Sequence, residues 1–346
     1  MTFDNPDLSQ RGRASIDFLG QLLLARAPIR KQMEEDLATA GVTAETLPDD
    51  IDEGIAQYEA ALDSSNASHA MDLIADWHFR TYGAIVTEAF EDIRPDLEPE
   101  LQALTQGPAK LFLDPEFTAP TYWQGVDFHR TEGGWDGHDH MGYIHGELVH
   151  KKLFSAIGMN SIFKQRAAAA GRAPKQRYAR ILDMGCSSGH YTSMLAQTYP
   201  DAKITGIELS ARMLEHALRT ANLKGYDWQL YQGAAEATMF ADESFDLVTS
   251  YILLHEMPAD AIEAMFAEAY RLLEPGGDMV MTDVPRYADM DKLAIVKADR
   301  DARDGGEPHW RSAAQLDVAA VAERLGFCNV STTAGYPFTI IATKPI

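Results

Sequence analysis

The sequence has few cysteines, few basic residues and no long apolar run. Only two cysteines, Cys186 and Cys328, occur among 346 residues, which gives no support to a disulfide framework. No apolar stretch approaches the ~20 residues needed to cross a bilayer, and the N-terminus has no signal-peptide core. A cytoplasmic location without membrane association is therefore expected.

Basic side chains are outnumbered by acidic ones. The chain has 30 Lys and Arg against 52 Asp and Glu, and its formal net charge is −22. Such a surface repels phosphate backbones and anionic lipid, so neither nucleic acid nor a membrane surface is an expected partner. The length is sufficient for two domains.

A strand–turn–helix pattern over residues 180–192 is the most informative stretch of the sequence. Ile181 and Leu182 predict a short buried strand that ends at Asp183, followed by a small-residue turn and a helix. Gly185 and Gly189 bracket the turn, where a missing Cβ lets the backbone approach a ligand closely. The helix that follows directs its free N–H groups towards a ligand over the loop.

A second predicted strand, residues 203–208, ends in Glu208. An acid at the tip of the second strand is where a nucleotide-binding α/β fold holds a ribose diol. Together these motifs resemble the class I S-adenosylmethionine-dependent methyltransferases. The family's first motif matches residues 183–189, with Ser187 where the family usually has its middle glycine. The resemblance assigns S-adenosylmethionine as cofactor and places these residues around it: Asp183, Gly185, Ser187, Gly189, Glu208 and Leu209.

Later landmarks extend the resemblance over residues 175–346. Residues 233–236 match a Gly-Asp-Ala-Glu segment except that Ala234 replaces the aspartate, which commonly accepts a hydrogen bond from the adenine amino group. Residues 244–246 and 275–277 match the start of the fourth strand and a Pro-Gly-Gly turn. The resemblance adds Ala235, Glu236 and Tyr251 to the cofactor site. It implies an α/β fold with a Rossmann-like, seven-stranded, mostly parallel sheet and helices on both faces.

The remainder of the chain divides into two further regions. Residues 1–105 carry helical periodicity and are expected to form a mostly α-helical domain that caps the active site, forms a homodimer, or both. Residues 106–174 are expected to contain a lid and connecting helices. The lid is the aperiodic segment of residues 122–147, which is rich in aromatic residues, glycine and histidine. The resemblance implies that residues 175–346 form the methyltransferase domain.

Five of the eleven histidines lie between His129 and His150. One hypothesis is a metal site formed by His138, His140, His145 and Glu147. The alternative, which we favour, is that these imidazoles line an acceptor pocket or cap helix ends, with His140 as a candidate catalytic residue and no metal bound.

The loop after the fourth strand contains His255 and Glu256, and in open α/β sheets this position faces the ligands. The pair is a candidate general base, because a carboxylate raises the pKa of a neighbouring imidazole. Alternatively, His255 only packs or caps the next helix. We therefore expect methyl transfer to a small-molecule acceptor through an unresolved O, S, N or C nucleophile. The alternatives are a cofactor-binding fold that does not methylate and a metal-dependent enzyme that uses the His-rich lid.

Overall fold

The computed structural model describes residues 3, 5–158 and 161–346, and a single mixed sheet organises them. The strand order is β1-β4-β3-β2-β5-β6-β8-β7. Strand β8 is antiparallel to both β6 and β7, and the other pairs are parallel. The strands are β1 (Lys110–Phe112), β2 (Arg180–Met184), β3 (Lys203–Glu208), β4 (Gln229–Gln232), β5 (Phe245–Tyr251), β6 (Leu273–Asp283), β7 (Cys328–Thr333) and β8 (Phe338–Thr343).

The sheet has the predicted Rossmann-like architecture and one strand more than predicted. The additional strand, β1, comes from the segment before the methyltransferase domain and pairs with the edge strand β4. The ring of Phe112 stacks on Tyr231 with centroids 4.4 Å apart. The sequence did not predict β1, because three half-exposed residues at a sheet edge show no apolar alternation.

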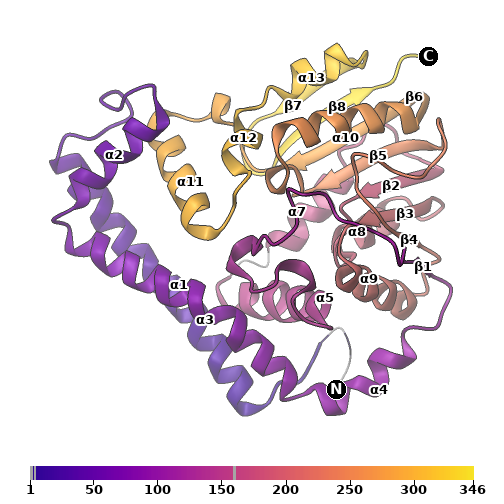
Figure 1. The fold of residues 1–346 in the computed structure, drawn as a ribbon, viewed down its shortest axis with the longest axis horizontal. Helices are drawn as coiled ribbons and strands as arrows, with labels where there is room; N and C mark the ends of the chain where they lie inside the picture. Colours follow the sequence, from indigo (N-terminus) through magenta and orange to yellow (C-terminus); the bar gives the residue numbers. More distant parts are fainter. Residues whose placement is uncertain (1–2, 4, 159–160) are drawn as a thin grey trace.

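Helices cover both faces of the sheet (Figure 1). One face packs on α8 (His190–Thr198) and α9 (Ala211–Lys224), and the other on α10 (Ala259–Leu272) and α13 (Val318–Arg324). Neighbouring residues of β2 serve opposite faces: Ile181 packs with α8 and α9, whereas Leu182 packs with α10. Burial on both faces explains why the central strands are apolar throughout instead of alternating with polar residues.

The N-terminal region is helical, as predicted, and forms an arm beside the sheet (Figure 1). Helices α1 (Gln10–Thr39) and α3 (Asn66–Glu91) lie side by side, with α2 (Ile51–Leu62) between them in sequence and α4 (Arg94–Ala103) following. Helix α1 continues through Pro28, where the apolar spacing of the sequence is interrupted.

A helix from the C-terminal half joins this arm to the sheet. Val296 of α11 (Lys292–Gly305) is buried in an apolar cluster with residues of α1, α2 and α3. Ion pairs Arg300–Asp72 (2.8 Å) and Arg303–Glu59 (2.7 Å) surround this contact. Because exposed ion pairs stabilise by only about 0–1 kcal/mol each, the apolar cluster supplies most of the stabilisation. Helix α11 ends at Gly305, and Gly306 caps it in a left-handed conformation.

The first of the connecting helices expected within residues 106–174 is not a regular α-helix. It consists of α5 (Met141–Tyr143), a π-helix η3 (Ile144–Leu153) and α6 (Phe154–Ala156), and α7 (Ser161–Ala170) follows. The π-helix changes which residues share a face, so helical periodicity did not predict where His145, Glu147 and His150 point.

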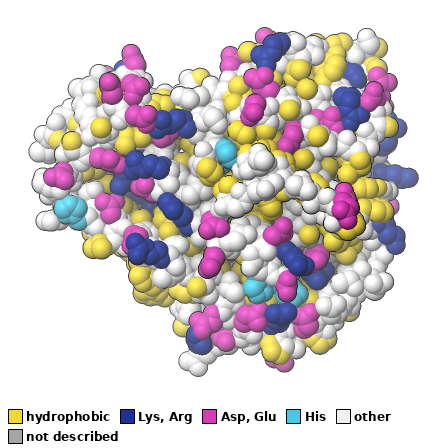
Figure 2. All heavy atoms as spheres, viewed as in Figure 1, with side chains coloured by type: hydrophobic (Ala, Val, Ile, Leu, Met, Phe, Trp, Pro, Cys, Tyr) yellow, Lys and Arg dark blue, Asp and Glu magenta, His cyan; other side chains and the backbone are white. Residues whose placement is uncertain are grey.

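Acidic and basic side chains are interspersed over the arm and the sheet domain on the face shown in Figure 2. Within the described ranges, every helix is either too short or too polar to cross a membrane.

Gly142 controls how closely the lid packs on α9. A Cβ at this position would lie 2.5 Å from the carbonyl oxygen of Arg212 and 2.6 Å from Cβ of His216, whereas a Cβ at Gly83 in α3 would meet nothing within 4 Å. We expect Gly142→Ala to lower the free energy of unfolding by about 1–3 kcal/mol through overpacking. Gly83→Ala should raise it by up to about 1 kcal/mol through helix propensity. Urea unfolding of both variants measures the difference, and equal effects would contradict the close packing.

Candidate active site

A cavity of about 720 Å³ lies where the carboxyl ends of the parallel strands meet the lid and the helical arm. Its sheet side is formed by the loop after β2, the end of β3, the segment after β4 and the end of β5. The opposite walls come from α3, the lid, the π-helix, α7 and α11. The cavity is therefore built by all three regions of the chain.

The loop after β2 has the backbone conformation that its glycines suggest. Gly185 has φ of 69°, and its N–H donates to the carbonyl oxygen of Ile207 (2.8 Å). A Cβ at Gly185 would lie 2.8 Å from the side chain of Leu253. Ser187 also adopts a left-handed conformation, with φ of 47°. This conformation explains the family's glycine at position 187, and serine adopts it at a cost of about 1–2 kcal/mol.

Glu208 is held in position at the end of β3. Its two carboxylate oxygens accept hydrogen bonds from the backbone N–H groups of Ser187 (3.1 Å) and Ser210 (3.0 Å). Burial raises the pKa of Glu208 to about 7, although these two hydrogen bonds oppose the shift. Glu208 lines the cavity, so its ionisation is coupled to whatever binds there.

Two of the predicted cofactor residues, Asp183 and Gly189, lie behind the cavity wall. Asp183 accepts a hydrogen bond from the hydroxyl of Thr192 (2.7 Å), and burial raises its pKa to about 7. Its second oxygen, Oδ1, has no partner among the described residues. Gly189 lets α8 approach the rest of the domain, because a Cβ there would lie 3.0 Å from the ring of Trp228.

The other predicted cofactor residues line the cavity: Gly185, Ser187, Glu208, Leu209, Ala235, Glu236 and Tyr251. The carboxylate of Glu236 accepts a hydrogen bond from the hydroxyl of Tyr122 (2.9 Å), which connects the lid to the sheet. The hydroxyl of Tyr251 is buried without a partner among the described residues.

The lid is held closed by hydrogen bonds to both neighbouring regions. The indole N–H of Trp135 donates to Glu256 (3.2 Å), and the hydroxyl of Ser210 donates to the carbonyl oxygen of Trp135 (2.9 Å). From the arm, the hydroxyl of Tyr82 donates to the carbonyl oxygen of His129 (2.8 Å).

His129, which the sequence did not single out, pairs with two carboxylates. Its Nδ1 lies 2.5 Å from Glu307 and its Nε2 lies 3.4 Å from Glu256. Burial alone would lower the pKa of His129, but the neighbouring carboxylates of Glu256 and Glu307 outweigh it and raise the pKa to about 10. Burial raises the pKa of Glu256, but His129 outweighs this effect, so the net shift is downwards. No sequence motif connects positions 129 and 307, so only the fold reveals this pairing.

His255 and Glu256 do not form the pair expected from their adjacency. Nδ1 of His255 lies 3.0 Å from Asp283, and Nε2 lies 3.9 Å from Glu307. Burial lowers the pKa of His255, but Asp283 outweighs it, so the net shift is upwards. The side chain of His255 is only 3% exposed and does not line the cavity, whereas Glu256 does. The orienting carboxylate is therefore Asp283.

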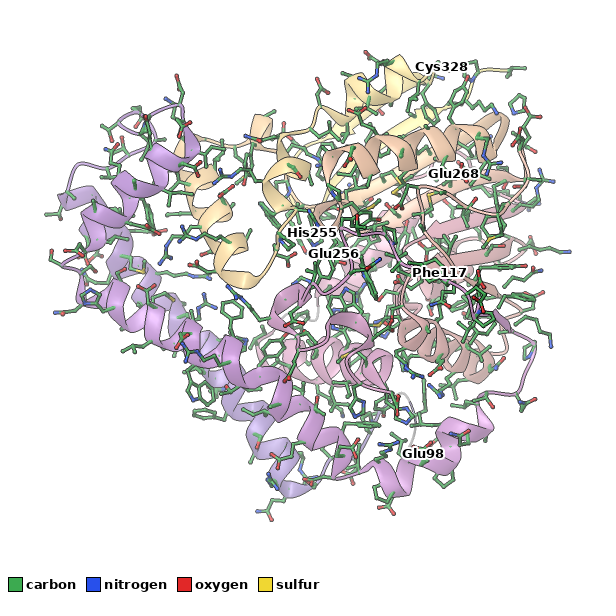
Figure 3. The ribbon with its side chains drawn as sticks, in the orientation of Figure 1. Glu98, Phe117, His255, Glu256, Glu268 and Cys328 are labelled. Carbon is green, nitrogen blue, oxygen red and sulfur yellow. The ribbon has the colours of Figure 1, made fainter. Side chains whose placement is uncertain are left out.

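The four-residue metal set proposed for the lid is not assembled. His138 pairs with Glu91 (3.0 Å), and His140 pairs with Glu98 (3.2 Å). Figure 3 shows Glu98 on α4, far from His255 and Glu256. His140 does not line the cavity and joins the lid to α4 instead.

The other two members of that set point elsewhere. The ring of His145 faces the cavity and lies 4.6 Å from the ring of Trp135. Glu147 is buried, with His216 at 3.2 Å and Lys151 at 2.5 Å. Among the described residues, no three of His138, His140, His145 and Glu147 bring ligand atoms within 4.8 Å of one another, so they do not form a common metal site.

Arg166 on α7 is a second cavity residue that the sequence did not indicate. It is buried, and its guanidinium lies 5.7 Å from the ring centre of Tyr251. Burial lowers the pKa of Arg166 to about 10. Within the described ranges it makes no ion pair with a carboxylate, and its Nη1 has no partner. A buried cation that lacks a counter-ion is suited to an anionic group of a ligand.

The fold and this site define a Rossmann-like domain that binds a nucleotide-type cofactor at the carboxyl ends of its strands. Residues 181–277 match the family model described as "Methyltransferase domain". This part of the chain is a methyltransferase domain of the class I, S-adenosylmethionine-dependent family, whose cofactor is S-adenosylmethionine.

Two curated relatives illustrate the similarity. The chain is 31% identical over 144 residues to a ubiquinone/menaquinone biosynthesis C-methyltransferase of Desulfotalea psychrophila, a match that covers 38% of this chain and 57% of the relative. It is 34% identical over 109 residues to a fatty-acid O-methyltransferase of Mycolicibacterium smegmatis, covering 31% and 38%. The chain thus matches less than two thirds of either relative's length.

Among solved structures, phosphoethanolamine N-methyltransferase 2 of Haemonchus contortus in complex with S-adenosyl-L-methionine aligns with a TM-score of 0.45 at 16% identity. That alignment covers 57% of this chain and 59% of the other.

The raised pKa of Glu208 predicts pH-dependent cofactor binding. If the ionised carboxylate accepts the ribose hydroxyls, a pKa of about 7 gives an affinity that rises about tenfold from pH 6 to pH 8 as Glu208 loses its proton. Calorimetry of S-adenosylmethionine binding measures this profile, and Glu208→Gln should bind more weakly and lack the Glu208-dependent rise. Ionisation of the ligand itself affects both proteins equally. A rise of the same size in Glu208→Gln would rule out Glu208 as the titrating group.

Proposed function

We propose that this protein transfers a methyl group from S-adenosylmethionine to a small molecule enclosed in the cavity. The observation that supports this most directly is the continuity of the cavity. It extends from Ser187 and Glu208 on the sheet side to His129 and His145 on the lid side. S-adenosylmethionine supplies an electrophilic methyl group when bound. The acceptor nucleophile is an O, S, N or C atom.

The residues present suit the cofactor. Gly185 and Ser187 give a loop whose backbone a ligand can approach, and Glu208 presents a carboxylate for the ribose hydroxyls. Arg166 supplies a buried cation without a carboxylate partner in the described part of the chain, which suits the carboxylate of the methionine part. The ring of Tyr251, whose hydroxyl has no partner among the described residues, lies 5.7 Å from the same guanidinium. Asp183 and Gly189 would act indirectly, by shaping the loop.

The acceptor end of the cavity is largely aromatic. The rings that line it are Phe79, Tyr82, Trp123, Trp135, Phe154 and Trp310. Such walls exclude water and hold an apolar acceptor in line with the donor, which is most of what methyl transfer requires of a protein. Glu256 and His129 are among the polar groups that line the cavity with these rings. The names of the relatives, a quinone-biosynthesis enzyme and a fatty-acid enzyme, agree with an acceptor that has an apolar body.

Homodimerisation through the N-terminal helices remains a prediction. Phe18 of α1 and Leu73 and Trp77 of α3 are exposed, and the rings of Phe18 and Trp77 lie 5.6 Å apart. An exposed apolar patch of this kind is a candidate interface.

Methyl transfer is tested with donor labelled in its methyl group, incubated with the purified protein and a small-metabolite extract. We expect label in a small-molecule fraction and its loss in Glu208→Ala. Glu323→Ala, an exposed glutamate on α13, is the matched control and should retain full incorporation. Donor binding by calorimetry without label in any fraction would reject methyl transfer to small molecules and favour a cofactor-binding protein that does not methylate.

Arg166→Gln tests the role assigned to the buried guanidinium. Loss of a charge-assisted contact to the donor carboxylate should weaken S-adenosylmethionine binding by about 10- to 100-fold, because hydrogen bonds to charged groups contribute about 1.5–3 kcal/mol. Arg324→Gln, at an exposed ion pair with Glu263, is the control and should bind normally. Unchanged donor affinity in Arg166→Gln would show that the guanidinium does not bind the donor and that its role is in acceptor binding or in stabilising the fold.

A further inference from the structure

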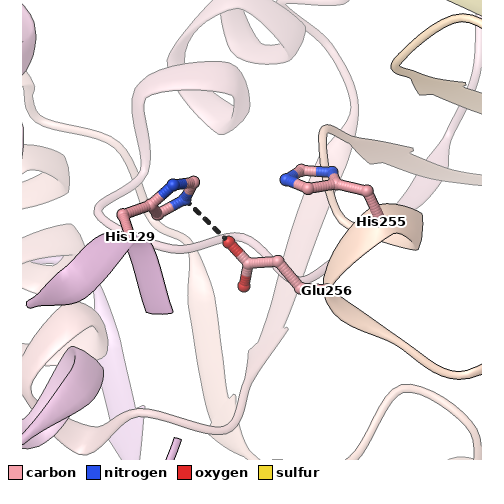
Figure 4. A group of neighbouring side chains, drawn as sticks. All are labelled: His129, His255 and Glu256. Atoms are coloured by element: carbon pink, nitrogen blue, oxygen red, sulfur yellow. Dashed lines mark ion pairs between the residues drawn. The ribbon is translucent and has the colours of Figure 1, made fainter. Parts of the chain in front are cut away.

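Three side chains in the cavity region direct potential ligand atoms towards one point. One ligand atom from each of His129, His255 and Glu256 lies within 4.8 Å of the other two. His129 comes from η1 (Phe128–Arg130) in the lid, and the other two come from η4 (Leu254–Glu256) after β5. Figure 4 shows the two imidazole rings on either side of the Glu256 carboxylate.

Each histidine is oriented by a further carboxylate on its Nδ1. Glu307 lies 2.5 Å from Nδ1 of His129, and Asp283 lies 3.0 Å from Nδ1 of His255. Both orienting carboxylates are buried, with side chains that are 8% and 0% exposed. An Nδ1–H donated to a carboxylate leaves the lone pair on Nε2, and this arrangement is the usual one for histidines that bind a metal ion.

The distances leave room for an ion between the ligand atoms. Nε2 of His129 lies 3.4 Å from Oε1 of Glu256, which is long for a hydrogen bond. Two ligands bonded to zinc at about 2.1 Å in a tetrahedral site lie about 3.4 Å apart. The other oxygen of Glu256 accepts the indole N–H of Trp135, so Oε1 is the oxygen that faces the histidines.

The charge around the three residues favours a cation. Throughout the described ranges, the only ion pairs that Glu256, Glu307 and Asp283 make are with His129 and His255. The second buried His–Glu cluster differs in this respect. There Glu147 lies among His190 and His216 but already pairs with Lys151. A lysine ammonium supplies the positive charge that a metal would bring, so the first cluster is the stronger candidate.

The backbone also shows that His129 is constrained. It has φ of 52° without being glycine or a residue in a regular turn of helix. Such conformations cost about 1–3 kcal/mol and persist where the surrounding structure enforces them, often at functional sites.

We propose that His129, His255 and Glu256 bind one divalent transition-metal ion of the Zn²⁺ type. Three protein ligands leave a coordination position for water or a substrate atom. Since His129 and Glu256 line the cavity, that position lies on the acceptor side. In this way the site deepens the proposed function: an acceptor with an oxygen or nitrogen donor would bind the ion. That second step rests on the proposed function, whereas metal binding itself does not.

Zn²⁺ titration of chelator-treated full-length protein tests the site by calorimetry, with Co²⁺ absorption as a spectroscopic readout of the ligand set. We expect one ion per chain and a tetrahedral or five-coordinate Co²⁺ spectrum. His129→Ala should weaken Zn²⁺ binding at least about 100-fold. Glu307→Gln, which removes only an orienting carboxylate, should weaken it by about 10- to 100-fold. His138→Ala, in the same lid but paired with Glu91 outside the cavity, is the control and should bind normally.

Circular dichroism and S-adenosylmethionine binding of each variant show that it is folded. Folded His129→Ala or Glu307→Gln protein that binds Zn²⁺ as tightly as the wild type would overturn the proposal, as would wild-type protein that binds no Zn²⁺. Neither result depends on methyl transfer. A metal-binding protein that fails the labelled-donor test would therefore refute only the proposed function, and a methylating protein without Zn²⁺ affinity would refute only the metal site.

Discussion

The contact between Glu256 and the lid is the interaction on which the enclosed cavity depends. Glu256 stands after β5 at the carboxyl edge of the sheet, and it pairs with His129 while accepting a hydrogen bond from Trp135. Glu307, which follows α11, holds the other side of His129. One partly buried network therefore joins the sheet, the lid and the helix that packs on the N-terminal arm. Such a network favours one arrangement of the groups that it joins.

Burial also sets the ionisation of the sheet side of the cavity. Asp183 and Glu208 lie at the ends of adjacent parallel strands, and desolvation raises the pKa of each to about 7. Because these pKa values lie near neutral pH, a ligand that enters the cavity can change the protonation of either carboxyl group at a small cost in free energy. Arg166, which lines the same cavity, is a buried cation without a protein carboxylate in the described part of the chain. The cavity wall thus presents both a carboxyl group and a guanidinium to a ligand.

The sequence predicted those elements of the domain whose structure is decided by neighbouring residues. The apolar residues of β2 and the small residues of the following turn require a buried strand and a tight loop, and the structure contains both. At Ser187 the structure explains the sequence pattern, because the left-handed backbone at this position is the reason why glycine is usual there. The sequence could not predict β1, a three-residue edge strand that is stabilised by contacts with the distant residues of β4.

The pairing of side chains across the cavity was decided by the tertiary structure alone. Adjacency in sequence suggested that Glu256 orients His255, but the sharp turn after β5 sends His255 inward to Asp283 and leaves Glu256 facing the lid. Density of histidines in the lid suggested a local metal set, yet the π-helix and the docking of α4 separate its members.

By itself the sequence therefore determined the sheet side of the cavity, because a strand, a glycine turn and an acid act over a few neighbouring residues. Only the fold brought His129, Arg166 and Glu307 to the same cavity, because they come from distant segments whose side chains meet through packing, and no local pattern records such a meeting.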